Sequence, residues 1–165
     1  MLFVGINPGV RSAIAGHHFA GYSNRFWKLL HESGLVPEPI GHLDDVRLPE
    51  WSYGITNLIA RPSPGIDTLK PEEYVAARDV LKKKIRRYKP KTVALVGVTL
   101  FRALFPEKRG EPVSLGRQRE TLSGAAVFVL PNPSGRNANF SYAEMLDAFK
   151  ALHRHAAART RRSGD

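Results

Sequence analysis

Apolar residues along the chain follow two patterns that alternate with each other. Short apolar runs are typical of strands buried on both faces of a sheet. Such runs occupy residues 2–6, 92–96 and 126–130, with a weaker one at 53–58. Apolar residues recur at helical spacing between them, in residues 24–33, 71–88 and from Ser141 onward.

Strands that alternate with helices predict a parallel sheet covered on both faces. We therefore expect an α/β fold, with three layers (α/β/α) and a central, mainly parallel four-stranded sheet. Pro71 begins one helical segment in a favourable position. Ser141 and Glu144 have the spacing of a capping box at the start of another. Residues 37–49 are rich in turn-forming residues and predict a loop.

The charge of the chain is strongly positive. It has 25 Lys and Arg residues against 15 Asp and Glu residues, a net charge of +10 over 165 residues. This excess favours a polyanionic partner such as nucleic acid. The absence of cysteine excludes a disulfide scaffold, a cysteine nucleophile and any thiolate metal site.

We expect a single domain at residues 1–155 and a basic tail at residues 156–165, which is either disordered or a frayed terminus. The first residues lack the charged start and long apolar stretch of a secretory signal. No apolar run approaches the roughly 20 residues that span a bilayer. The sequence therefore predicts a soluble cytoplasmic protein.

Asparagine residues lie at or near the ends of three predicted strands. Asn7 lies in Gly5-Ile6-Asn7-Pro8-Gly9, Asn57 lies near the end of the weaker run, and Asn132 opens Asn132-Pro133-Ser134-Gly135-Arg136-Asn137. Because ligands of parallel sheets bind at the carboxyl ends of strands, we expect these residues on one rim. Both motifs also fit simple turns. Alternatively, the first exposes backbone N–H groups, and in the second Arg136 grips a phosphate or enters a duplex.

Two further segments suit nucleic-acid binding. Phe19, in a loop bounded by Gly16 and Gly21, either stacks on a nucleobase or packs inward as a loop anchor. Residues 82–91 hold seven Lys and Arg residues, which form either a solvated helix face or a phosphate-binding patch.

Motifs of several other chemistries are missing. The chain has no G-x-G-x-x-G, Walker A or H-E-x-x-H sequence. The best residues for a metal-dependent nuclease are His17, His18 and the pair Asp44-Asp45, for which the sequence offers no further ligand.

Several motifs, in order, resemble the mismatch-specific uracil/thymine-DNA glycosylase family, a branch of the uracil-DNA glycosylase superfamily. The first part comprises Gly5-Ile6-Asn7-Pro8-Gly9, Gly16-His17-His18-Phe19 and Asn24-Arg25-Phe26-Trp27-Lys28. The others are Gly54-Ile55-Thr56-Asn57-Leu58 with Arg61, and Asn132-Pro133-Ser134-Gly135. The resemblance runs from about residue 3 to residue 150 and implies a fold like that of the superfamily.

The resemblance implies a monofunctional enzyme of base excision repair. Such an enzyme flips uracil mispaired with guanine out of duplex DNA and hydrolyses its N-glycosidic bond, leaving an abasic site. The implied partner is double-stranded DNA that contains a G:U or related mismatch, bound by a monomer at the nucleoid, with no metal and no cofactor.

The resemblance also assigns roles to residues. Asn7 corresponds to the catalytic residue, and Phe19 to the aromatic residue that stacks on the base. The rest of the implied base-binding set is Ile6, His18, Asn57 and Ser63. The loop that enters the duplex corresponds to Ser134, Gly135, Arg136 and Asn137, with Arg136 where some family members carry an apolar wedge.

The side-chain amide of Asn7 does not titrate near neutral pH, so this residue cannot act as a strong general base. We expect its carbonyl oxygen to orient the attacking water. Backbone N–H groups of residues 6–9 would stabilise the departing uracil anion, and uracil would leave faster than thymine. The alternative is a non-catalytic module that binds mismatches or abasic sites. Activity on thymine or modified cytosine stays open.

Overall fold

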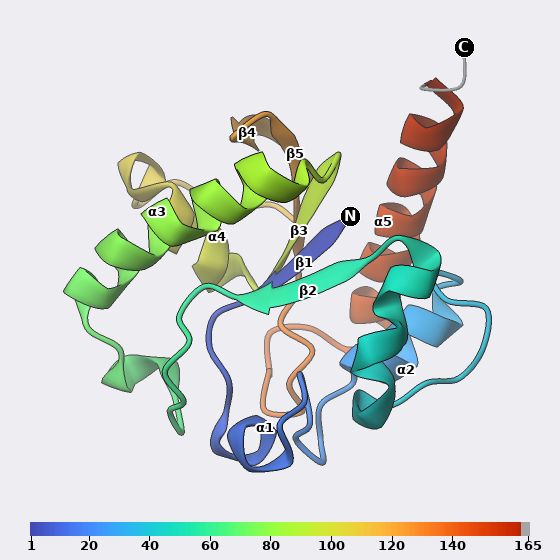
Figure 1. Ribbon diagram of the computed structural model, residues 1–165, viewed down its shortest axis with the longest axis horizontal. Helices are drawn as coiled ribbons and strands as arrows, with labels where there is room; N and C mark the ends of the chain where they lie inside the picture. Colours follow the sequence, from blue (N-terminus) through green and yellow to red (C-terminus); the bar gives the residue numbers. More distant parts are fainter. Residues whose placement is uncertain (163–165) are drawn as a thin grey trace.

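The computed structural model describes residues 1–162, which form one five-stranded sheet between two layers of helices (Figure 1). The strand order is β2-β1-β3-β5-β4. Four strands run parallel: β1 (Leu2–Gly5), β2 (Gly54–Asn57), β3 (Thr92–Val96) and β5 (Ala125–Leu130). At one edge, β4 (Gly116–Leu122) pairs antiparallel with β5.

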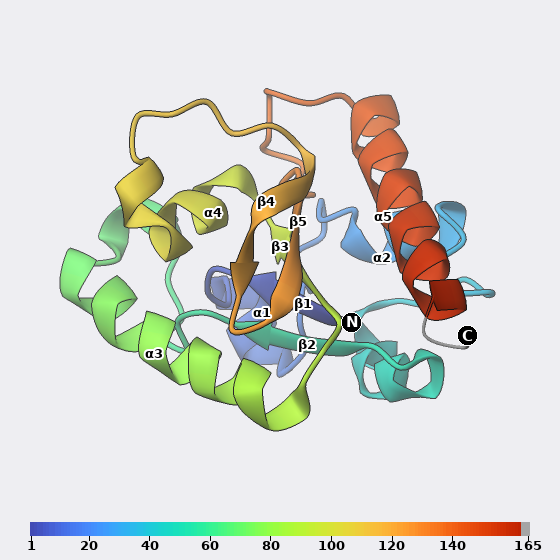
Figure 2. The same ribbon diagram turned by 90° about the horizontal axis from the view of Figure 1, so that it is seen from above.

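Helices cover both faces of the sheet (Figure 2). One face carries α3 (Pro71–Tyr88) and α4 (Val98–Leu104), and the other carries α2 (Phe26–Glu32) and α5 (Tyr142–Arg162). The remaining elements are short: helix α1 (Val10–Ala15) and the 3₁₀ turns η1 (His42–Trp51), η2 (Ile66–Thr68) and η3 (Pro106–Lys108).

Strand β3 shows why the parallel strands read as continuous apolar runs. All of its residues are buried. Val93 and Leu95 pack in the cluster under α3 and α4, whereas Ala94 and Val96 pack in the cluster under α2 and α5. Because successive side chains point to opposite faces, a strand between two helix layers must be apolar at every position.

The main predictions from the sequence are confirmed. The fold is α/β with three layers, and each predicted strand is present within one or two residues of its expected bounds. Helix α3 spans the predicted residues. Ahead of α5, the backbone N–H of Glu144 donates to Ser141 Oγ at 3.2 Å and that of Ser141 donates to Glu144 Oε1 at 3.1 Å, which is the predicted capping box.

The predicted number of strands is corrected from four to five by β4. Its residues alternate between exposed and half-buried positions along most of the strand, so it lacks the apolar run that marks the inner strands. An edge strand with a solvated face has this polar alternation. The segment at residues 37–49, predicted as a loop, contains the start of η1.

The disorder expected from residue 156 onward is corrected for residues 156–162, which continue α5 to Arg162. Ala and Arg are strong helix formers, so the helix continues beyond Leu152, its last buried residue. Residues 163–165 of that predicted tail lie outside the described residues. Within residues 1–162, no helix combines the length and apolar character that crossing a bilayer requires.

Candidate active site

A cleft of about 1160 Å³ lies where the parallel strands end. Loops after β1, β2 and β5 form its walls, together with α1 and the residues that follow it (Figure 1, lower part). In the parallel register Gly5 pairs with Asn57, which brings the ends of β1 and β2 to the same edge. Asn7, Asn57 and Asn132 all line the cleft, so the predicted rim is present.

The side chain of Asn7 is fixed by two residues of the loop after β2. Its Nδ2 donates to the carbonyl oxygen of Arg61 at 3.0 Å and to Ser63 Oγ at 2.8 Å. A backbone carbonyl only accepts hydrogen bonds, so the NH₂ end of the amide must face Arg61. The carbonyl oxygen Oδ1 is therefore the end of Asn7 that remains to accept a hydrogen bond from a molecule in the cleft.

Backbone hydrogen bonds join the loop of Asn7 to the loop after β2. Leu58 N donates to Gly5 O and Ile59 N to Ile6 O, both at 2.8 Å, and Ser63 N donates to Pro8 O at 3.1 Å. The two loops thus extend the pairing of β1 with β2 beyond the sheet. Asn7 is held by this backbone framework as well as by its own side-chain contacts.

An ion pair supports the carbonyl that holds Asn7. The Arg61 guanidinium donates to both carboxylate oxygens of Glu73, at 2.7 and 2.9 Å, and to Thr68 O at 2.9 Å. The Arg61 hydrogen bond, with that from the Lys70 backbone, lowers the pKa of Glu73 to about 2. Glu73 therefore stays ionised at neutral pH, and the side chain of Arg61 is tied to the first turn of α3.

Phe19 and Asn57 meet at Gly5, at the end of β1. A Cβ on Gly5 would lie 2.7 Å from Asn57 Oδ1 and 3.3 Å from Phe19 Cζ, closer than side chains tolerate. The Phe19 ring is half-buried and packs on Phe26 with centroids 4.3 Å apart. Its φ of +49° lies in the left-handed region. Phe19 thus packs inward as a loop anchor, one of the two sequence interpretations, and it also lines the cleft. Its stacking on a base stays a prediction.

The loop of Phe19 is held by Asp45, which comes from η1. The buried Asp45 carboxylate lies 2.9 Å from His17 Nδ1 through Oδ1 and accepts the His18 backbone N–H at 3.1 Å through Oδ2. Burial alone would raise the pKa of Asp45, but these hydrogen bonds bring it below the usual value. Burial lowers the pKa of the His18 imidazole, and the attraction of Asp45 offsets only part of that effect. His18 is therefore neutral at neutral pH.

The loop after β5 is braced by its own side chains. Ser134 N donates to Asn132 Oδ1 at 3.0 Å, and Asn137 Nδ2 donates to Asn132 O at 2.9 Å. Gly135 lies against Ser23, where a Cβ would come within 2.5 Å of the Ser23 Cβ. Arg136 is exposed at the cleft and forms no ion pair with any other residue of the described chain.

The predicted site residues therefore lie together, with two exceptions. The residues that line the cleft are Ile6, Asn7, His18, Phe19, Asn57, Ser63, Ser134 and Arg136. Gly135 and Asn137 brace the loop from behind. The hypothetical nuclease ligands are divided, because Asp44 accepts from Gly41 N at 2.9 Å and only Asp45 contacts His17. Residues 1–162 hold no cluster of three His, Asp or Glu side chains suited to a metal ion.

Sequence reasoning missed the supporting roles of Asp45, Arg61 and Glu73. Asp45 was considered only as a metal ligand, and Arg61 only as part of a motif. Nothing in the spacing of residues 45 and 17 indicates their contact, since 28 positions separate them. The acidic first turn of α3, with Glu72 and Glu73, was the one available signal for a basic partner.

We expect Asp45→Asn to destabilise the fold, because an amide has one acceptor oxygen for two donors. The cost of leaving one buried group unpaired is about 1–3 kcal/mol, seen as a lower melting temperature in circular dichroism. The pKa of His18, followed by NMR, should fall further once the carboxylate that raises it is gone. Asp44→Asn is the matched control, since Asn caps a helical turn about as well as Asp. Equal melting temperatures for the two variants would show that the Asp45 carboxylate does not hold the loop of Phe19.

Comparisons with known proteins agree with this geometry. The family model described as "Uracil DNA glycosylase superfamily" matches residues 1–153. A curated relative, the "G/U mismatch-specific uracil DNA glycosylase" of Schizosaccharomyces pombe (strain 972 / ATCC 24843), is 34% identical over 172 aligned positions. The alignment covers 94% of this chain and 53% of the relative. The chain thus spans about half the length of the curated relative that it matches.

The family match extends from the first strand into α5 and includes every loop that forms the cleft. On the strength of this match, the chain belongs to the uracil DNA glycosylase superfamily.

Proposed function

We propose that this chain is a monofunctional DNA glycosylase, which hydrolyses the N-glycosidic bond of uracil mispaired with guanine in duplex DNA and leaves an abasic site. Membership of the superfamily supports a glycosylase. The name of the fission yeast relative, a G/U mismatch-specific enzyme, supports the mismatch as substrate. We propose further that the chain acts as a monomer.

The observation that carries this proposal is the fixed amide of Asn7. Its NH₂ end is held by Arg61 and Ser63, so Oδ1 is left to accept a hydrogen bond from water. Because the amide is neutral, it orients the water and does not take its proton. The C1′–N1 bond breaks with both electrons going to the base, the water oxygen bonds to C1′, and the water proton goes to solvent or to the released base.

The pocket around Gly5 suits a flipped pyrimidine. Phe19 supplies an aromatic surface, and the Asn57 amide supplies a donor and an acceptor for the edge of the base. The loop at residues 6–9 lines the same cleft, and its backbone N–H groups would stabilise the uracil anion. A base without a donor and an acceptor on that edge would not form these hydrogen bonds, and a polar atom of the Asn57 amide would be left unpaired.

His18 and Ser63 act differently in this scheme. Ser63 Oγ accepts from Asn7 and donates to Gly65 O at 2.8 Å, so it orients Asn7 and has no proton left for the base. Its influence on the choice of pyrimidine would therefore pass through Asn7. The lowered pKa of His18 keeps the imidazole neutral, which avoids a positive charge in the pocket.

Extruding the base leaves a gap in the duplex, and a mismatched pair costs less to open than a matched one. Arg136 projects from a braced loop beside the cleft, so the loop needs little ordering when it enters that gap. The net charge of +10 holds the DNA backbone during these steps.

The alternative is a non-catalytic module that binds mismatches or abasic sites. The same cleft would serve it, but such a module has no use for an amide oriented to hold water. A G·U duplex incubated with the protein and then cleaved with alkali distinguishes the two: strand scission at the uracil supports the glycosylase. An intact strand with retained mismatch binding would support the module. Excision that persists with a chelator present separates the glycosylase from a metal-dependent nuclease.

We expect Asn7→Ala to lose roughly 100-fold or more in single-turnover excision, because the water loses its orienting group. Binding of a G·U duplex, followed by fluorescence anisotropy, should change little, since the basic surface is intact. Uracil release at the wild-type rate would remove Asn7 from the mechanism.

Gly5→Ala should impair excision more than it impairs folding. The added methyl group would meet Asn57 Oδ1 at 2.7 Å and close the pocket beside Phe19. Gly41→Ala is the control, because no atom lies within 4 Å of its Cβ position. We expect a clear loss of single-turnover rate for the first variant only, at melting temperatures that show both to be folded. Wild-type excision by Gly5→Ala would argue that the base does not occupy this pocket.

Glu73→Gln should lower the excision rate about tenfold with little change in substrate affinity, because a loosened Arg61 carbonyl no longer holds Asn7 in place. The neighbouring Glu72→Gln removes the same charge from the same turn, and Glu72 forms no ion pair within residues 1–162. Steady-state kinetics on G·U duplex should separate the two variants in kcat. The same kcat for both variants would show that the ion pair with Glu73 is not needed to hold Arg61 in place.

A further inference from the structure

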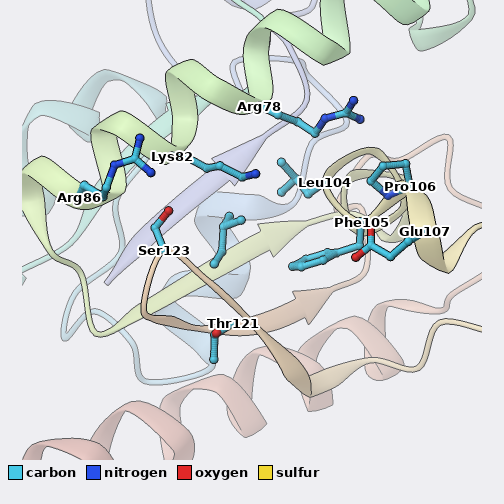
Figure 3. Close-up of a pocket in the computed structure, with 10 residues that line it drawn as sticks. Arg78, Lys82, Arg86, Leu104, Phe105, Pro106, Glu107, Thr121 and Ser123 are labelled. Carbon is cyan, nitrogen blue, oxygen red and sulfur yellow. The ribbon is translucent and has the colours of Figure 1, made fainter.

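A second hollow, which we call the α3 groove, lies away from the cleft (Figure 3). It has a volume of about 490 Å³ and is bounded by α3, by the end of α4 with η3, and by the turn between β4 and β5. Ser123, in that turn, precedes β5, whereas Asn132 of the cleft follows it. The length of β5, roughly 20 Å at about 3.3 Å per residue, separates the two sites.

One wall of the groove is a row of cations on α3. Arg78, Lys82 and Arg86 recur every fourth residue, which spaces them about 6 Å apart along the helix axis. Arg78 Nη1 donates to Ala103 O at 2.8 Å, so this guanidinium is tethered to α4. Within residues 1–162 none of the three has a carboxylate within ion-pair distance. Their charge is available to a ligand.

The other side of the groove has a single carboxylate that would repel an anion and no exposed aromatic ring on which a base could stack. Leu104, Phe105 and Leu122 are buried and close the bottom. Ser123 is exposed and presents a hydroxyl, whereas the side chain of the exposed Thr121 points away from α3 (Figure 3). The single carboxylate of the lining, on Glu107, lies at the end away from Arg86 (Figure 3). The groove is therefore most positive at its Lys82–Arg86 end.

These features favour an acidic peptide over single-stranded nucleic acid. In an extended chain, side chains on one side recur about every 6.6 Å, close to the spacing of the cations on α3. Single-stranded DNA needs exposed aromatic faces on which its bases stack. The only aromatic residue of the groove, Phe105, is 7% exposed. A volume of this size holds a few residues of a peptide.

We propose that the α3 groove docks an acidic, extended segment of a partner protein. Alternate carboxylates of the segment pair with Lys82 and Arg86, and with Arg78 at the far end. Because the groove and the cleft lie at opposite ends of β5, the segment and a DNA duplex bind together. The groove thus recruits the chain to a partner without occupying its cleft, and this inference does not depend on the proposed glycosylase activity.

The test uses a fluorescein-labelled peptide of alternating aspartate and serine, with its asparagine–serine counterpart as blank. Anisotropy is measured with the full chain at physiological ionic strength. The double variant Lys82→Glu/Arg86→Glu should weaken binding at least about tenfold, as expected when two charge pairs of an interface are reversed. Lys83→Glu/Arg87→Glu carries the same change in charge on exposed residues outside the groove and should bind almost as the wild type does.

Saturating mismatched duplex should leave the peptide bound. Equal losses in both double variants would overturn the proposal, because the attraction would then be general to the basic surface. Displacement of the peptide by duplex would also overturn it, since the two would share the cleft. Oligothymidylate of matched charge provides a third test. If it binds more tightly than the peptide, and only the groove variant weakens its binding, the proposal is overturned, because the groove is then a site for single-stranded DNA. Lys82→Gln/Arg86→Gln repeats the test if charge reversal prevents folding.

Discussion

The proposed active site depends on one hydrogen bond, from Asn7 Nδ2 to the carbonyl oxygen of Arg61. A neutral amide can guide a water molecule only if its two ends are told apart, and a backbone carbonyl does this because it accepts and never donates. The rest of the rim keeps that carbonyl in place. The paired loops after β1 and β2 fix the backbone, and Glu73 fixes the side chain of Arg61.

Charged and neutral side chains have different places and different roles in this chain. Cations are abundant on the outside, where they attract a polyanion over a distance and are moderated by salt. The groups at the base pocket are a phenyl ring, two amides and an imidazole whose pKa is lowered by burial. The charges on Asp45, Arg61 and Glu73 are engaged in contacts that hold the loops around this proposed pocket. In the proposed function, binding strength and chemical selectivity are therefore set by different residues.

The sequence was sufficient for those parts of the fold that depend on burial. Residues 92–96 are apolar throughout because helices cover both faces, and residues 71–88 begin with proline and keep one apolar side. Strand β4 escaped detection because its solvated face makes it polar, and η1 because its short 3₁₀ turns have no apolar period. The rim asparagines were predictable from strand ends. The contacts of Asp45 with residues 17 and 18 were not, since they arise only when η1 packs beside the cleft.

The backbone of Phe19 lies in the left-handed region, which affects how a substitution at this position changes the stability of the fold. An aromatic residue at a φ of +49° carries about 1–2 kcal/mol of conformational cost, which glycine would not incur. The hydrogen bond from His18 N to Asp45 and the packing of the ring on Phe26 hold the backbone of Phe19 in this conformation. A glycine at this position would remove that cost, but it would also remove the packing on Phe26 that anchors the loop, which is worth more. Selection for heat resistance alone would therefore keep an aromatic ring here, whatever its part in the proposed chemistry.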